Sequence, residues 1–119
     1  MADRRLQAVA ETRAFAEGID ALLSEEERNA VIVDIATHPE GGDLIPESGG
    51  LRKRRIPLRG RGKRGGARVI TLYLGPQFPV YAIFVFAKNE RADLSPGQKR
   101  TLSRLVGDIK AQVHRRAKR

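Results

Sequence analysis

Cysteine and tryptophan are absent from this chain of 119 residues, and histidine occurs only as His38 and His114. Without cysteine there can be no disulfide, no thiolate nucleophile and no zinc site of the cysteine-containing type. Two histidines also exclude a site of three histidines, and neither has a recognisable acid–base partner in the sequence. We therefore expect no metal and no cofactor.

Long hydrophobic runs are also missing. The longest, Val80–Ala87, is about a third of the length that a membrane-spanning helix needs. No apolar segment follows the charges at the N-terminus, so no secretory signal is visible. We expect a single domain over residues 1–119, located in the cytoplasm and without a membrane partner.

Acidic residues are absent from residues 51–68, which contain nine Lys or Arg. Residues 1–50 show the opposite balance, with four basic and eleven acidic residues. A solvated structural surface usually mixes the two signs. The segregation, on a chain of net charge +9, predicts that the later part of the chain binds a polyanion.

Helical signals lie at both ends of the chain. Residues 14–23 carry an apolar stripe, and Ser24 with Glu27 forms a capping box that begins a second helix, so a helical hairpin is predicted. Residues 6–12 fit either a strand or the first turns of that hairpin. Ser95, Pro96 and Gln98 predict the start of a C-terminal helix, with a basic tail over about 114–119.

Three strand candidates lie between these helices, at residues 51–58, 67–74 and 80–87. They predict a small antiparallel sheet, with the third strand central and the charged first strand toward an edge. Residues 43–50 are interpreted as a loop. The predicted class is α+β, with the hairpin and the C-terminal helix packed on the sheet.

The basic segment is the densest chemical signal. On a strand, Lys53 and Arg55 share one face while Arg52 and Arg54 share the other. A charged edge strand that discourages association is the alternative, but nine basic residues exceed that need. Residues 60–65 match the letters of a dinucleotide-binding loop, yet a strand follows where that motif needs a helix. These glycines instead predict a loop that brings basic side chains close to phosphates.

Several motifs in order resemble the RelE/HigB-type toxins of bacterial toxin–antitoxin systems. They are Gly49-Gly50-Leu51-Arg52-Lys53, the segment from Gly60 to Ile70, Ala87-Lys88-Asn89-Glu90, and Asp93-Leu94-Ser95. The likeness runs from about residue 12 to residue 106. It implies a RelE-like fold and metal-independent endoribonuclease activity on messenger RNA in the ribosomal A site. It also implies neutralisation by a cognate antitoxin, which we expect to be HigA-like with a helix-turn-helix domain.

The resemblance also implies which residues act. It assigns catalysis to Lys53, Arg55, Arg68 and Lys88, and RNA binding to Arg52, Arg59, Arg61, Lys63, Arg64 and Asn89. Arg68 and Lys88 would hold phosphate, while Lys53 or Arg55 would assist proton transfer.

One departure from the family concerns a tyrosine near the C-terminus of well-known members, since none follows Tyr81 here. Either lysine does the acid–base work, or this branch positions RNA differently. Two alternative functions stay open at this stage. One is a non-catalytic RNA- or DNA-binding module on the same basic sheet, and the other is a ParE-like gyrase poison, whose family lacks such a basic site.

Overall fold

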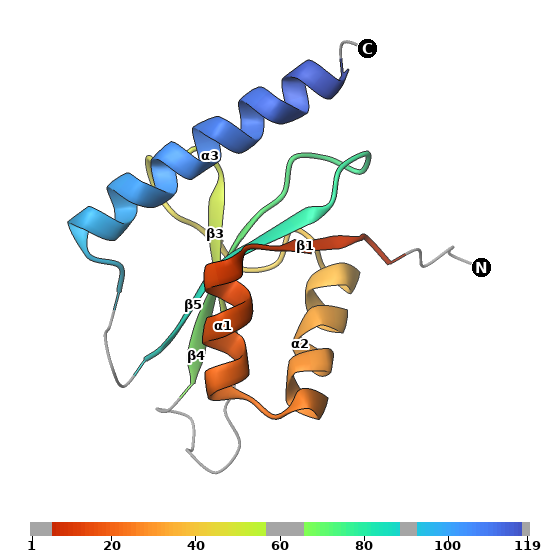
Figure 1. Cartoon of the computed structure of the whole chain (residues 1–119), viewed down its shortest axis with the longest axis vertical. Coiled ribbons are helices and arrows are strands. Elements are labelled where there is room, and N and C mark those ends of the chain that lie inside the picture. The colour runs from red at the N-terminus through yellow and green to blue at the C-terminus, as the bar shows by residue number, and fades with distance from the viewer. Residues whose placement is uncertain (1–5, 57–65, 89–92, 118–119) are drawn as a thin grey trace.

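The structure is a computed structural model that describes residues 6–56, 66–88 and 93–117 (Figure 1). The elements are β1 (Val9–Glu11), α1 (Arg13–Leu22), α2 (Glu25–Thr37), β2 (Asp43–Leu44), β3 (Leu51–Ile56), β4 (Ala67–Leu72), β5 (Val80–Ala87) and α3 (Pro96–Ala117). The α+β class is confirmed. No helix among these residues is long and apolar enough to cross a membrane.

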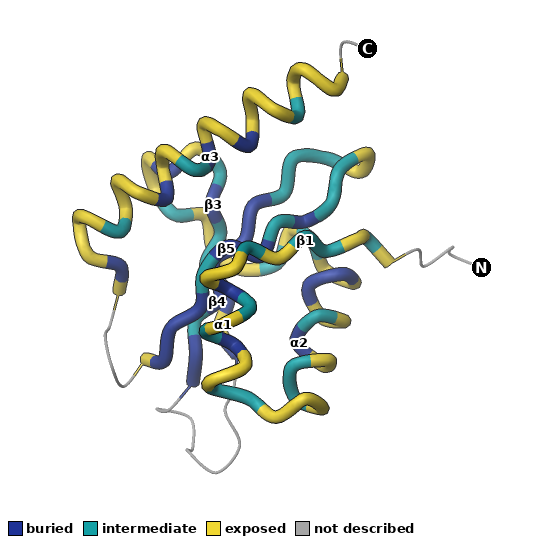
Figure 2. Tube along the Cα trace, in the orientation of Figure 1, coloured by how far each residue is buried: buried dark blue, intermediate teal, exposed yellow. Residues whose placement is uncertain are grey.

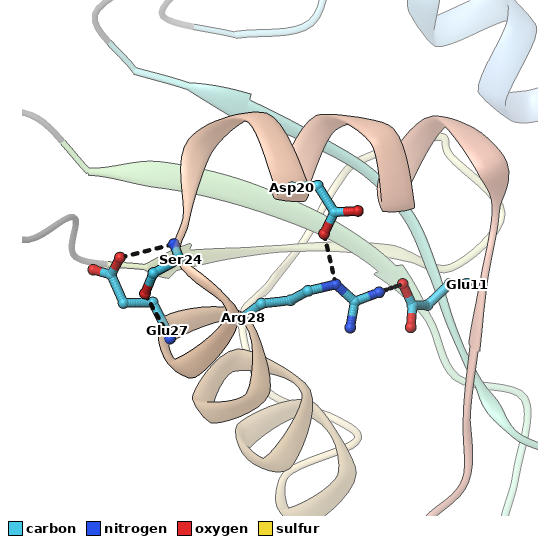
Figure 3. A network of polar contacts seen from close by, with 5 residues as sticks. All are labelled: Glu11, Asp20, Ser24, Glu27 and Arg28. Carbon is cyan, nitrogen blue, oxygen red and sulfur yellow. Dashed lines mark hydrogen bonds and ion pairs between the residues drawn. The ribbon is translucent and has the colours of Figure 1, made fainter.

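The second helix begins where the sequence predicts a cap (Figure 3). The Ser24 hydroxyl accepts from the Glu27 N–H at 3.2 Å, and the Glu27 carboxylate accepts from the Ser24 N–H at 3.0 Å. This is the predicted capping box. From the next residue, Arg28, the guanidinium pairs with Asp20 at 2.9 Å and with Glu11. Arg28 therefore ties α2 to both α1 and β1.

The sheet is mixed, so the prediction of an antiparallel sheet was wrong in one respect. The strand order is β1-β5-β4-β3-β2, and β1 lies parallel to β5 while the other pairs are antiparallel. The three predicted strands form the expected antiparallel meander. Strands β1 and β2 have three and two residues, which is too short to show a hydrophobic period. The partner of β1 is also distant in sequence, and residues 43–44, which were expected in a loop, pair with β3.

The sheet has a core on each face. On one face α1 and α2 contribute Phe15, Ile19, Val31 and Ile35, which pack against residues such as Val69. On the other face α3 covers a second cluster, whose members include Leu51, Ile70, Phe86, Leu102 and Val106. Figure 2 shows the buried strands between helices that are largely exposed on their outer sides.

The C-terminal helix begins as predicted. The Ser95 hydroxyl accepts from the Gln98 N–H at 3.1 Å, and the Gln98 side chain accepts from the Ser95 N–H at 2.9 Å. The helix then continues through most of the residues expected as a basic tail, as far as Ala117. Basic residues in its last turn favour this extension, because cations stabilise the C-terminal end of the helix dipole.

Candidate functional site

Alternation along β3 separates its basic side chains onto the two faces of the sheet. Ile56 packs in the core under α1 and α2, whereas Leu51 packs in the core under α3. Because successive side chains on a strand point to opposite faces, Arg52 and Arg54 lie on the α1/α2 face. By the same alternation Lys53 and Arg55 share the other face, as predicted, which is the face that α3 covers. Arg55, at the end of the strand, also borders a pocket lined by α2 residues such as Glu27.

Arg54 is buried, with 5% of its surface exposed. Its guanidinium donates to the carbonyl of His38 at 2.8 Å and to the carboxylate of Asp34 at 3.5 Å. Burial lowers the pKa of Arg54 from its ordinary value, and the charge of Asp34 opposes that shift. Arg54 therefore holds the end of α2 against β3. Arg52, on the same face, donates to the carbonyl of Gly42 at 3.2 Å.

Arg55 and Arg68 meet on the α3 face, because they are direct partners in the register between β3 and β4. Both side chains pass close to Gly66, where a built Cβ would lie 3.8 Å from Arg55 Nε and 3.8 Å from Arg68 Nη1. Arg55 is exposed and Arg68 half-buried, and Arg68 Nη1 also donates to the carbonyl of Ala67 at 3.4 Å. Two arginines on paired positions can bind the oxygens of one phosphate.

Lys53 extends this basic cluster along β3. It lies two residues before Arg55 and opposite Ile70 in β4. Its ammonium pairs with the carboxylate of Asp93 at 3.6 Å. The backbone N–H of Leu94 donates to that carboxylate at 2.8 Å. This hydrogen bond holds the pKa of Asp93 below its ordinary value. Burial opposes the shift, and the charge of Lys53 adds to it. The start of α3 therefore fixes the position of a predicted catalytic side chain.

Lys88 follows β5 at a turn and is exposed. Its backbone N–H donates to the carbonyl of Gly66 at 2.9 Å, so its backbone is held beside the start of β4. This contact lies next to the pair Ala67 and Ala87 in the register. The structure thus brings Lys53, Arg55 and Arg68 together on one face and places the Lys88 backbone at its border.

Five of the predicted RNA-binding residues lie outside the described residues: Arg59, Arg61, Lys63, Arg64 and Asn89. Sequence reasoning missed the contribution of Asp93, although the segment Asp93-Leu94-Ser95 was part of the resemblance. An acidic residue just before a helix is more simply interpreted as part of its cap, so only the fold reveals that it reaches Lys53.

The histidines lie apart from this cluster. His38 Nδ1 is 3.3 Å from the carboxylate of Asp34, so His38 has an acidic partner that the sequence did not reveal. Both groups are largely exposed at the end of α2, beside Arg54. His114 lies in the last turn of α3. Within the three described ranges, no three acidic or histidine side chains form a group that could hold a metal ion.

The arrangement is chemically suited to an anion whose charge increases during a reaction. Arg55 and Arg68 supply planar, permanently charged donors. Lys53 supplies an ammonium that is held by a carboxylate. Preorganised cations of this kind stabilise a transition state without rearranging as it forms.

A comparison with protein families matches most of the chain. The sequence model described as the RelE toxin of the RelE/RelB toxin–antitoxin system matches residues 8–117. The matched region includes every helix and strand that the structure describes. A toxin of this kind is one half of a two-protein system, so the match implies a cognate antitoxin. The chain belongs to the RelE toxin family of toxin–antitoxin systems.

Proposed function

We propose that the protein is an endoribonuclease toxin that cleaves messenger RNA in the ribosomal A site. Toxins of the RelE family are generally endoribonucleases, which supports the reaction class. The observation that carries the proposal is the pairing of Arg55 with Arg68 across β3 and β4, with both side chains close to Gly66. A cognate antitoxin, HigA-like and with a helix-turn-helix domain, would prevent this activity.

The reaction begins when the RNA 2′-hydroxyl attacks the adjacent phosphorus and ends when the 5′-oxygen of the next nucleotide leaves. The phosphate gains negative charge as it becomes five-coordinate. Arg55 and Arg68 bind its non-bridging oxygens, and Lys88 contributes from the border of the sheet. Each such donor stabilises the transition state by about 3 kcal/mol, as oxyanion donors do in other enzymes.

Proton transfer is the second requirement. The 2′-hydroxyl loses its proton to solvent as it attacks, and the leaving 5′-oxygen gains one. We assign the second transfer to the ammonium of Lys53, because arginine stays protonated and is the poorer acid–base group. The ribosome holds the RNA and supplies the in-line geometry of the attack.

The test replaces Arg55 or Arg68 with alanine and measures growth after induction, together with new 5′ ends in translated mRNA. We expect each change to slow cleavage by about 100-fold, the effect of losing one charged donor. Arg13→Ala is the matched control, because Arg13 lies on α1 in an exposed pair with Glu17. Full toxicity of the Arg55 and Arg68 variants would contradict the site. If the wild-type protein is toxic but produces no new 5′ ends in translated mRNA, it binds RNA without cutting it.

A further inference from the structure

A groove opens beside Lys53 on the α3 face of the sheet. It has a volume of about 990 Å³ and runs between the segment from β2 to β3 and the N-terminal half of α3. This volume falls within the range of pockets that bind small ligands. Lys53 lines it, so the groove is continuous with the cluster that includes Arg55 and Arg68.

The wall formed by α3 is cationic. Lys99, Arg100 and Arg104 line the groove, and all three are exposed. None of them forms an ion pair with another described residue. Asp93, which precedes the helix and also lines the groove, pairs with Lys53 and interacts with the charge of Lys99. The three cations outnumber this carboxylate and attract the phosphates of a nucleic acid strand.

The opposite wall carries two carboxylates, Asp43 and Glu47. Asp43 is the register partner of Lys53, so its position beside the cluster is fixed by the sheet. Glu47 has a φ of 57°, the one positive φ of a described residue other than glycine. Such a conformation is uncommon for glutamate, and the surrounding structure has to maintain it.

The segment around Glu47 is firmly held. The Ser48 hydroxyl donates to the carbonyl of Ile45 at 2.6 Å and accepts from the Leu51 N–H at 3.0 Å. Next to it, Gly49 lies so close to α3 that a Cβ there would come within 3.1 Å of Val106. The backbone that carries Glu47 is therefore held in place, while the carboxylates of Asp43 and Glu47 are exposed.

We propose that this groove binds one nucleotide adjacent to the scissile phosphate and discriminates among bases at that position. The proposal rests on the proposed function. The phosphate lies against the α3 wall, and the base lies against Asp43 and Glu47. Carboxylates accept hydrogen bonds from amino groups of bases, as in their contacts with cytosine N4. Adenine, cytosine and guanine carry an exocyclic amino group. Uracil offers a carboxylate only its N3–H, which lies between two carbonyl oxygens that a carboxylate repels, so the groove disfavours uracil.

The experiment uses an mRNA library with a randomised codon, translated in the presence of the full-length toxin, and maps every new 5′ end by sequencing. The wild type should avoid uracil at one position next to the cut by about 10-fold, the effect of one good base contact. Combining Asp43→Asn with Glu47→Gln should abolish that bias, because an amide also offers donors to uracil. An unchanged bias in this variant would overturn the proposal.

The cationic wall is tested separately. Arg100→Ala and Arg104→Ala should each raise KM about equally for all codons, because phosphate contacts carry no sequence information. Arg115→Ala is the matched control on the same helix, since Arg115 does not line the groove.

The same experiments distinguish a failure of the groove proposal from a failure of the proposed function on which it rests. If the wild type cuts no translated mRNA, the proposed function fails. If it cuts normally while the wall variants leave both KM and base bias unchanged, only the groove proposal fails. Weakened antitoxin binding by these variants, without any change in cleavage, would instead identify the groove as a protein-binding surface.

Discussion

Arg54 shows how one residue of the basic segment serves the fold. A buried charge needs partners, since it loses its hydration on folding. The guanidinium finds them in Asp34 and in the carbonyl of His38, while its Nε has none among the described residues. Gly41 packs against it, and a Cβ there would lie 3.1 Å from Arg54 Nη1. The sequence predicted which face Arg54 occupies, but not that α2 covers it.

Replacing Arg54 with alanine should lower the free energy of unfolding by about 2–3 kcal/mol, through a buried cavity and the loss of hydrogen bonds to a charged group. Arg52→Ala is the neighbouring control and should lower it by less than about 1 kcal/mol, because it removes one exposed bond to Gly42. Urea unfolding followed by circular dichroism measures both. Equal effects of the two changes would contradict the role assigned to Arg54.

At the scale of elements, the sequence predicts features that depend on neighbouring residues and misses very short strands and contacts between residues far apart in the chain. The Ser24 and Ser95 capping boxes and the three longer strands were predicted because each depends on neighbours within a few residues. The parallel strand β1 was left open because it has three residues and pairs with a distant strand. The strand β2 was interpreted as loop because it has only two residues, both exposed, although its partner β3 is near in sequence. The same limit applies to the candidate site, where the contact between Lys53 and Asp93 joins residues 40 positions apart.

Substitution of Gly66 tests whether the pairing of β3 with β4 has to hold Arg55 and Arg68 in fixed positions for cleavage. A Cβ at this position would lie 2.9 Å from the carbonyl oxygen of Ile56, closer than real Cβ atoms approach, so the backbone must shift. We expect Gly66→Ala to slow cleavage by about 10- to 100-fold by displacing Arg55 and Arg68, although every basic residue remains.

The matched control is Gly107→Ala in α3, where nothing lies within 4 Å of a new Cβ. It should raise the free energy of unfolding by about 1 kcal/mol through helix propensity and leave cleavage unchanged. Single-turnover cleavage and thermal unfolding measure the pair. If the Gly66→Ala variant cleaves at the wild-type rate, cleavage does not depend on the pairing that places Arg55 beside Arg68.

At the scale of the whole molecule, the charge segregation of the sequence becomes a difference between the faces of the sheet. The helices α1 and α2, on one face, carry six acidic and two basic residues. The other face carries α3 and the cluster of Lys53, Arg55 and Arg68, together with the carboxylates of the groove. A negatively charged strand is therefore attracted to the α3 face and repelled from the opposite one. An antitoxin that neutralises the protein would compete for that same face.

The most direct test of the account compares one mRNA in two states, naked and under translation, with the same purified toxin. We predict that the toxin binds the naked RNA but cuts it slowly, and cuts it efficiently when ribosomes translate it, since the protein supplies cations and the ribosome supplies in-line geometry. Arg68→Ala should remove cleavage in the translated sample. Rapid cleavage of the naked RNA at physiological salt would contradict the account and indicate a ribonuclease with its own acid–base pair.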